Sequence, residues 1–185
     1  LYNLAYTLLM GDKYSQAAST FSEALKSSPA LPQRMQDDAL IRMADAQYYA
    51  GSYKQALRNY SAAIDNRAQD SDYATFRRAV MYGLDGDIKR KLSELSAMPS
   101  EFPGSKWLPN ALLEKGQTYS GLGETSKAVE AFEQLRASYK QSAQARKGML
   151  NLAITYMEAK QPEKAEATYK EVIMKWPSSE EAVLA

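Results

Sequence analysis

The sequence repeats one pattern of small residues five times along its length. The small residues that set the register are Ala5, Ala44, Ala79, Gly116 and Ala153, at successive spacings of 39, 35, 37 and 37 residues. Periods in this range are typical of helical repeat arrays. Such a chain cannot build one central core, because each unit buries its apolar face only against its neighbours. The sequence therefore predicts a stack of five similar units.

Each copy of the pattern carries two apolar rows with the spacing i, i+4, i+7. In the first copy the rows begin with Leu1 and Ala5, and then with Ala17 and Phe21. This spacing places one apolar stripe on one face of a helix, so each unit is predicted to be a helical hairpin. The small residue in each stripe allows two helix axes to approach closely.

Turn and junction residues extend the pattern. Glycines fall at the expected turn between the two helices, and prolines close three of the units. These residues are Gly11, Gly51, Gly86 and Gly123, and Pro29, Pro103 and Pro177. With these motifs the chain resembles the tetratricopeptide repeat (TPR) family over essentially all 185 residues.

The resemblance implies an all-α fold, a right-handed superhelix of antiparallel helical hairpins (an α-solenoid). The expected repeats are residues 1–31, 32–69, 70–104, 105–141 and 142–178, and residues 179–185 would begin a sixth. The chain starts inside an apolar stripe and stops inside a repeat. We therefore expect a single repeat array that is part of a longer protein.

Three junctions share an aromatic residue followed, three positions later, by serine. They are Phe102 to Ser105, Tyr139 to Ser142 and Trp176 to Ser179. Each serine is placed to cap the next helix. Long-period repeats with this junction resemble the bacterial envelope subfamily, typified by outer-membrane assembly lipoproteins and the periplasmic partner of the Tol system. The resemblance favours the periplasm or cell envelope over the cytoplasm.

Composition excludes several classes of function. The chain has 23 basic and 22 acidic residues, a net charge of +1 and no long block of one sign, so no nucleic-acid partner is expected. No stretch approaches the roughly 20 apolar residues of a membrane helix, so no membrane contact by this segment is expected. Histidine and cysteine are absent. We accordingly assign no catalytic residues, no metal site and no cofactor, and predict that the chain is not an enzyme.

The family resemblance implies that the other face of the first helices lines a concave groove. That face is unusually aromatic in the first three repeats, and two arginines lie one repeat apart on it. The rings would stack on a partner, and the arginines would orient its carboxylates or backbone carbonyls. The candidate partner-binding residues are Tyr2, Tyr6, Ile41, Arg42, Asp45, Tyr48, Tyr49, Phe76, Arg77 and Val80. Alternatively, superhelical winding or further repeats cover this face.

These observations predict a non-catalytic scaffold that binds a peptide or protein partner in the concave groove. Two alternatives stay open: a periplasmic or outer-membrane assembly or cell-division scaffold, and a regulatory or docking arm of a larger enzyme. An apolar row near Tyr169, Ile173 and Trp176 also predicts end-to-end self-association.

Repeat three breaks the pattern more often than the others. Lys91 stands where the other repeats have alanine, and its ammonium is expected to reach water. Pro99 removes a backbone donor, so the helix is expected to end or kink at about Ala97 or Met98. Repeat three is therefore the predicted weak point of the array.

Overall fold

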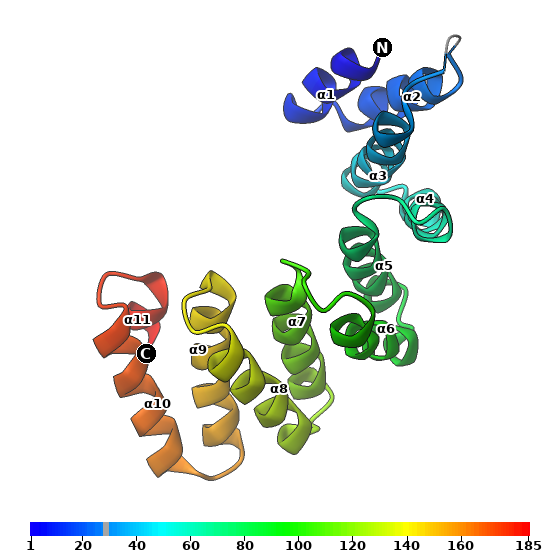
Figure 1. The fold of residues 1–185 in the computed structure, drawn as a ribbon. Helices are drawn as coiled ribbons and strands as arrows, with labels where there is room; N and C mark the ends of the chain where they lie inside the picture. Colours follow the sequence, from blue (N-terminus) through cyan, green and yellow to red (C-terminus); the bar gives the residue numbers. More distant parts are fainter. Residues whose placement is uncertain (28–29) are drawn as a thin grey trace. The chain divides into compact units, whose positions relative to one another are not determined.

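The computed structural model describes residues 1–27 and 30–185, and this part of the chain contains helices and no strand (Figure 1). The prediction of an all-α repeat fold is confirmed. The helices are α1 (Tyr2–Met10), α2 (Tyr14–Leu25), α3 (Gln33–Tyr49), α4 (Tyr53–Asp65), α5 (Ser71–Leu84), α6 (Ile88–Glu101), α7 (Leu108–Gly121), α8 (Thr125–Ser138), α9 (Ala143–Glu158), α10 (Pro162–Lys175) and α11 (Glu180–Leu184). The expected closing residue Pro29 lies outside the described residues.

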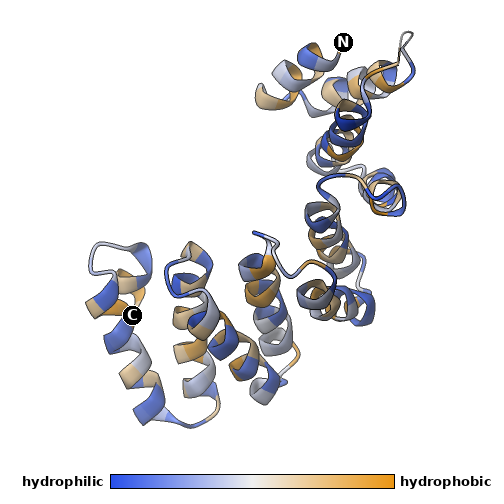
Figure 2. Cartoon of the chain, viewed as in Figure 1, coloured by the Kyte–Doolittle hydropathy of each residue, from blue (hydrophilic) through white to orange (hydrophobic). Residues whose placement is uncertain are grey.

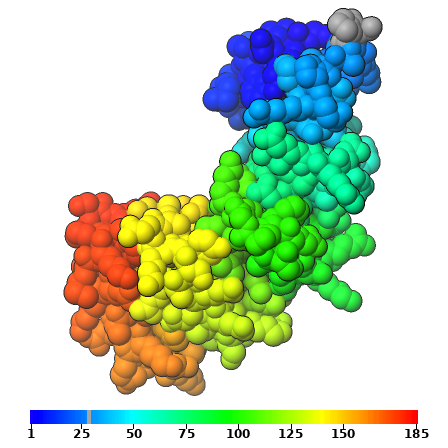
Figure 3. All heavy atoms as spheres, in the orientation of Figure 1, coloured from blue at the N-terminus to red at the C-terminus, as the bar shows by residue number. Residues whose placement is uncertain are grey.

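The helices form two compact units, Leu1–Lys91 and Leu92–Ala185. In the first unit each helix from α1 to α5 packs against the next one along the chain. In the second unit α7 to α10 pack in the same sequential way, and α11 packs against α9 and α10. Figure 3 shows this second unit as closely packed atoms, coloured from green to red. The boundary between the units falls inside α6, in repeat three.

The small-residue columns form the core of both units. Ala5, Ala44, Ala79 and Ala153 have no exposed surface, and Gly116 is also buried. The matching alanines of the second helices, Ala17, Ala56, Ala128 and Ala165, have none either. Figure 2 shows the alternation of apolar and polar residues around the helices that this packing requires. The predicted register of the repeats is confirmed.

Left-handed backbone conformations close most of the turns between paired helices. Gly51, Gly86 and Gly123 have φ angles of 76°, 81° and 72°, where a side chain would be strained. In the first repeat Gly11 has a φ of −96°, and the following Asp12 takes the left-handed conformation with a φ of 57°. Aspartate tolerates this conformation better than most residues.

Two of the three expected serine caps are confirmed. The hydroxyl of Ser142 accepts a hydrogen bond from the Ala145 amide at 3.0 Å, and that of Ser179 accepts one from Ala182 at 3.1 Å. Ser105 instead accepts one from the Trp107 amide at 3.0 Å, before α7 begins. It stabilises the preceding turn, so the prediction that it caps the helix is wrong.

Repeat three differs from the prediction at its proline. Helix α6 continues through Pro99 to Glu101, so the expected end at Ala97 or Met98 is wrong, and the alternative of a kink there stays a prediction. Pro99 lies in the last turn, where it forfeits a single helical bond. The helical hydrogen-bond pattern resumes beyond Pro99, because the Phe102 amide donates to the Met98 carbonyl at 2.8 Å.

Lys91 is largely buried, with 9% of its surface exposed, and the contact of its ammonium with water stays a prediction. A β-carbon added to Gly83 of α5 would lie 2.8 Å from its Cδ and 3.1 Å from its Nζ. Lys91 therefore occupies space that exists only because residue 83 has no side chain. The long side chain of Lys91 on α6 is matched on α5 by a glycine, which has no side chain. The ammonium of Lys91 lies against this Gly83.

The last helix packs against α9 and α10 near the apolar row predicted to self-associate. Glu181 of α11 is 5% exposed, and its Oε2 lies 2.6 Å from Nε of Arg146 in α9. Ile173 remains 43% exposed and Met174 75% exposed. End-to-end association through this row stays a prediction. None of the described helices is both long and apolar enough to cross a membrane.

The close approach of α7 and α8 gives a direct test of the packing. A β-carbon on Gly116 would lie 2.4 Å from Cε1 of Phe132, which is fully buried. We expect Gly116→Ala to lower the free energy of unfolding by about 1–3 kcal/mol, because the ring must move within a filled core. Urea denaturation followed by circular dichroism measures this change.

Gly121→Ala in the same helix is the matched control. Nothing lies within 4 Å of a β-carbon at that position, so helix propensity should leave stability unchanged or raise it by up to about 1 kcal/mol. Equal effects of the two substitutions would contradict the close approach of α7 and α8.

Candidate functional site

A buried carboxylate lies at the centre of the first unit. Asp45 of α3 is 5% exposed, and its Oδ1 accepts hydrogen bonds from Tyr60 Oη at 2.5 Å and from Tyr73 Oη at 2.7 Å. Its Oδ2 accepts one from Arg42 Nη1 at 2.6 Å. The two tyrosines belong to α4 and α5. Asp45 therefore joins three consecutive helices through charge-assisted hydrogen bonds.

A second carboxylate extends this network to α1. Asp38 lies two turns before Asp45 on α3, and its Oδ1 is 3.3 Å from Nε of Arg42. Its Oδ2 accepts hydrogen bonds from the hydroxyl of Tyr2, at 2.6 Å, and from that of Tyr6. Arg42 thus bridges both aspartates, and the two tyrosines tie the first helix to the third.

The guanidinium of Arg77 lies among aromatic rings of the same unit. Its central carbon is 4.4 Å from the ring centroid of Tyr48 and 5.8 Å from those of Tyr49, Tyr60 and Tyr73. Nη1 also donates to Tyr73 Oη at 3.3 Å. Such cation–π contacts strengthen when the cation is removed from water. Arg77 is consequently held by its own chain.

The pKa values of the tyrosines and of Arg42 in this network are raised. Burial, and then the charge of Asp45, raise the pKa of Tyr60 and of Tyr73 above the usual 10.0. Burial alone would lower the pKa of Arg42, but Asp45 and Asp38 raise it above its ordinary value. The tyrosines therefore stay protonated as donors and the arginine stays charged at neutral pH.

A groove of about 570 Å³ lies beside this network. At its rim the rings of Tyr14 and Tyr49 are stacked, with centroids 5.1 Å apart and an interplanar angle of 27°. Tyr49 is 53% exposed and Met10 is 80% exposed. We call this the tyrosine groove. It is lined by Tyr6, Leu9, Met10, Asp12, Tyr14, Arg42, Asp45, Tyr49 and Tyr73.

The structure brings four of the ten predicted site residues into the tyrosine groove. They are Tyr6, Arg42, Asp45 and Tyr49. Tyr2 lines a neighbouring pocket of about 220 Å³. The other predicted residues do not line the groove: Tyr48 packs on Arg77, and Phe76, Arg77 and Val80 lie outside its lining.

Two features of the predicted site need correction. Ile41 borders the neighbouring pocket, but it is only 1% exposed, so it belongs to the core and offers almost no surface to a partner. Arg42 is bound to Asp38 and Asp45, and Arg77 lies against tyrosine rings, so both guanidiniums already have partners within the chain. The sequence showed two arginines one repeat apart, but it could not show that aspartates and rings of adjacent helices surround them.

Sequence reasoning missed Met10, Asp12, Tyr14 and Tyr73 as part of the groove. The first three lie at or beside the turn between α1 and α2, where helical periodicity does not show which way the side chains point. The left-handed conformation of Asp12 and the ring stack of Tyr14 place this turn at the rim.

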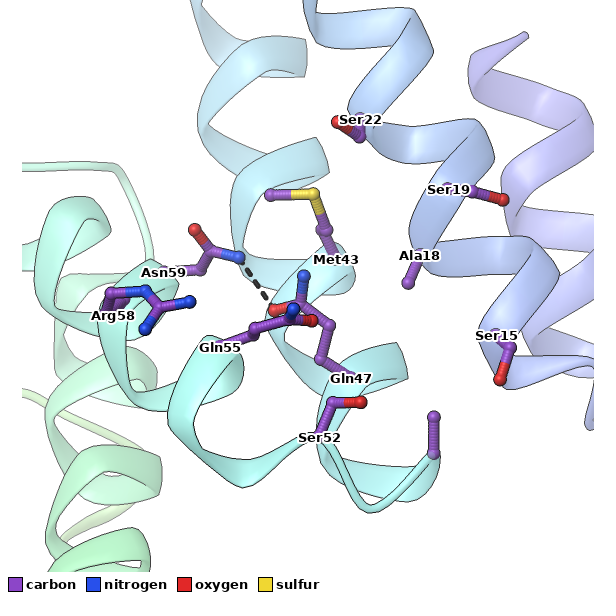
Figure 4. A pocket seen from close by; sticks show the side chains of 11 residues that line it. Ser15, Ala18, Ser19, Ser22, Met43, Gln47, Ser52, Gln55, Arg58 and Asn59 are labelled. Atoms are coloured by element: carbon purple, nitrogen blue, oxygen red, sulfur yellow. Dashed lines mark hydrogen bonds between the residues drawn. The ribbon is translucent and has the colours of Figure 1, made fainter.

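A second pocket, of about 530 Å³, lies among α2, α3 and α4 (Figure 4). Four serines and three side-chain amides contribute to its lining, and Asn59 Nδ2 donates to Gln47 Oε1 at 2.7 Å within it. No aromatic side chain lines this pocket. It lacks the rings that usually anchor a protein partner. Among the described residues no group of three or more acidic side chains could hold a metal ion.

The antiparallel hairpins and the repeating small-residue columns define a helical repeat protein. A family profile described as a tetratricopeptide repeat matches residues 41–104 and 113–180. The chain therefore belongs to the tetratricopeptide repeat family. Comparison with curated protein sequences gave no significant match.

Solved structures of similar fold are also repeat proteins. A tetratricopeptide repeat protein from Parabacteroides merdae is 20% identical with a TM-score of 0.72, over 96% of this chain and 66% of that one. MamA from Desulfovibrio magneticus is 18% identical with a TM-score of 0.76, over 97% of this chain and 96% of that one. The C-terminal part of a repeat protein from Cytophaga hutchinsonii is 14% identical with a TM-score of 0.75, over 96% of this chain and 65% of that one. At these identities the likeness establishes the fold alone.

The buried carboxylate provides a test of the network. We expect Asp45→Ala to lower the free energy of unfolding by about 2–4 kcal/mol, because it leaves Arg42 without its closest counter-ion and two buried hydroxyls without an acceptor. Asp65→Ala, at an exposed position on α4, should change stability by less than about 0.5 kcal/mol. Urea denaturation of both variants distinguishes a structural network from a dispensable surface charge.

The raised pKa values of Tyr60 and Tyr73 make the stability of the fold fall as the pH rises into the alkaline range. The unfolded chain loses phenolic protons near pH 10.0, whereas folding holds them on Tyr60 and Tyr73. Their contribution is therefore fully present below that pH and declines as the pH rises above it. The double variant Tyr60→Phe, Tyr73→Phe should lose stability less steeply above pH 10.0 than the wild type, as measured by urea denaturation. Tyr53→Phe, at an exposed position, should keep the wild-type slope.

Proposed function

We propose that this chain is a non-catalytic scaffold that binds a segment of another protein in the tyrosine groove. Tetratricopeptide repeat proteins generally act as non-enzymatic scaffolds, and this chain has neither histidine nor cysteine. Its buried aspartates, arginines and tyrosines are bonded to one another, which suits them to hold a surface rather than to react.

One observation carries the proposal: four tyrosines, of which Tyr49 is exposed, line a hollow and are held in place by hydrogen bonds to buried carboxylates and by ring stacking. Tyr6 and Tyr73 are fixed through Asp38 and Asp45, and Tyr49 is stacked on Tyr14. A surface that is ordered before binding loses little conformational entropy when the partner arrives. Tyrosine is also enriched among the residues that dominate binding energy.

A selection of random peptides on the immobilised chain tests this function, with affinities measured by fluorescence anisotropy. Tyr49→Ala should weaken binding of the selected peptides by about 1–3 kcal/mol, because the ring is an exposed anchor at the rim. Thermal unfolding should change much less than in Asp45→Ala, since Tyr49 is 53% exposed, although its ring contacts Tyr14, Tyr48 and Arg77.

Tyr53→Ala is the matched control. Tyr53 is 50% exposed, belongs to the same unit and lines a different pocket. Peptides that bind wild type and Tyr49→Ala equally would show that the tyrosine groove is not the binding surface.

A further inference from the structure

We propose that the tyrosine groove takes a basic side chain, arginine or lysine, of a protein partner against the Tyr14–Tyr49 stack, with Asp12 as its counter-ion. This inference rests on the proposed function and specifies the chemistry of the partner. It reverses the expectation that guanidiniums of this chain would bind carboxylates of the partner.

The charges that line this face favour a cation. The tyrosine groove and the neighbouring pocket meet at the Asp38–Arg42 pair, since Arg42 lines the first and Asp38 the second. Together their linings include five aspartates and two arginines, with no lysine or glutamate. These residues are Asp12, Asp37, Asp38, Asp45 and Asp70, and Arg34 and Arg42. The whole chain has a net charge of +1, so this negative excess is local. Such an excess attracts basic segments.

Asp12 is the carboxylate available at the rim. Its Oδ1 accepts a hydrogen bond from Tyr14 Oη at 2.6 Å, and the residue is exposed. Within residues 1–27 and 30–185 it forms no ion pair with a lysine or arginine, whereas Asp38 and Asp45 are both paired with Arg42. Asp12 is thus an exposed carboxylate beside an aromatic face, hydrogen-bonded by Tyr14.

The same unit already holds a guanidinium in the manner we propose. Arg77 lies 4.4 Å from the centroid of Tyr48 and within 5.8 Å of Tyr49, and the guanidinium of Arg42 is 5.3 Å from the centroid of Tyr73. Arg42 combines a ring with two carboxylates, and Arg77 is surrounded by tyrosine rings. The rim offers a similar set of groups in Tyr14, Tyr49 and Asp12, where Arg77 approaches Tyr49 at 5.8 Å and the Tyr14 ring is the one left for a partner's cation. A basic side chain of the partner completes the arrangement.

The test uses N-acetyl-arginine methylamide and its uncharged citrulline counterpart as probes, with the tyrosine ring signals of the full 185-residue chain followed by NMR. The arginine compound should shift the signals of Tyr14 and Tyr49 saturably. The citrulline compound should bind at least about fivefold more weakly, because it lacks the charge. Raising the salt from about 0.05 to about 0.5 M should weaken the arginine compound, since the rim is exposed.

Asp12→Asn is the decisive variant because asparagine also tolerates the left-handed conformation that residue 12 adopts. It should weaken the arginine compound by about fivefold while leaving thermal unfolding unchanged. Asp65→Asn, at an exposed position away from the groove, makes the same change of charge and should bind like wild type.

The outcomes separate this inference from the proposed function. Three results would each overturn the proposal that the groove takes a basic side chain. They are equal binding of the arginine and citrulline compounds, no shift of the Tyr14 and Tyr49 signals, and an unchanged affinity in Asp12→Asn. If selected peptides nevertheless lose affinity in Tyr49→Ala, the groove binds proteins through other chemistry. If those peptides are indifferent to Tyr49, the proposed function fails as well.

Discussion

The close packing of small residues between paired helices is the constraint on which the remaining structure depends. Ala5 and its equivalents leave no exposed surface, so the backbones of neighbouring helices approach as near as side chains permit. A repeat array has no central core that could compensate for a poor contact elsewhere. Each contact must therefore be satisfied locally, and the Gly83–Lys91 pair shows how. The repeat with a long side chain in the alanine column has no side chain opposite it.

This packing also explains how a polar site can form inside an apolar array. The helices α3, α4 and α5 are close enough for Asp45 to accept hydrogen bonds from Tyr60 and Tyr73 while Arg42 binds it on the same helix. A buried carboxylate is costly unless it is paired and hydrogen-bonded, and here both conditions are met. The network fixes the inner tyrosines of the groove. It leaves Tyr14, Tyr49 and Asp12 at the rim as the groups that a partner can reach.

Much of the fold could be predicted because it depends on periodicity. The five helical hairpins, the buried columns and the caps at Ser142 and Ser179 all follow from spacing along one helix or one turn. The errors arose where the outcome depends on a neighbouring helix. Ile41 was expected at the surface and is buried, and the space that Lys91 occupies depends on the missing side chain of Gly83 on the neighbouring helix. The extension of α6 through Pro99 depends on how little a proline costs in a last helical turn.

The sequence by itself determined that this chain is an all-helical repeat protein, because helix formation and stripe spacing are local properties repeated five times. It also marked the first three repeats as rich in tyrosine and arginine. Only the tertiary structure decided which of these groups are bound within the chain and which remain available. That decision depends on distances between helices α1, α3, α4 and α5, which place Arg42 between two aspartates and Arg77 among four rings. Tertiary contacts thus pair the guanidinium of Arg42 within the chain, and a paired guanidinium no longer acts as a free cation.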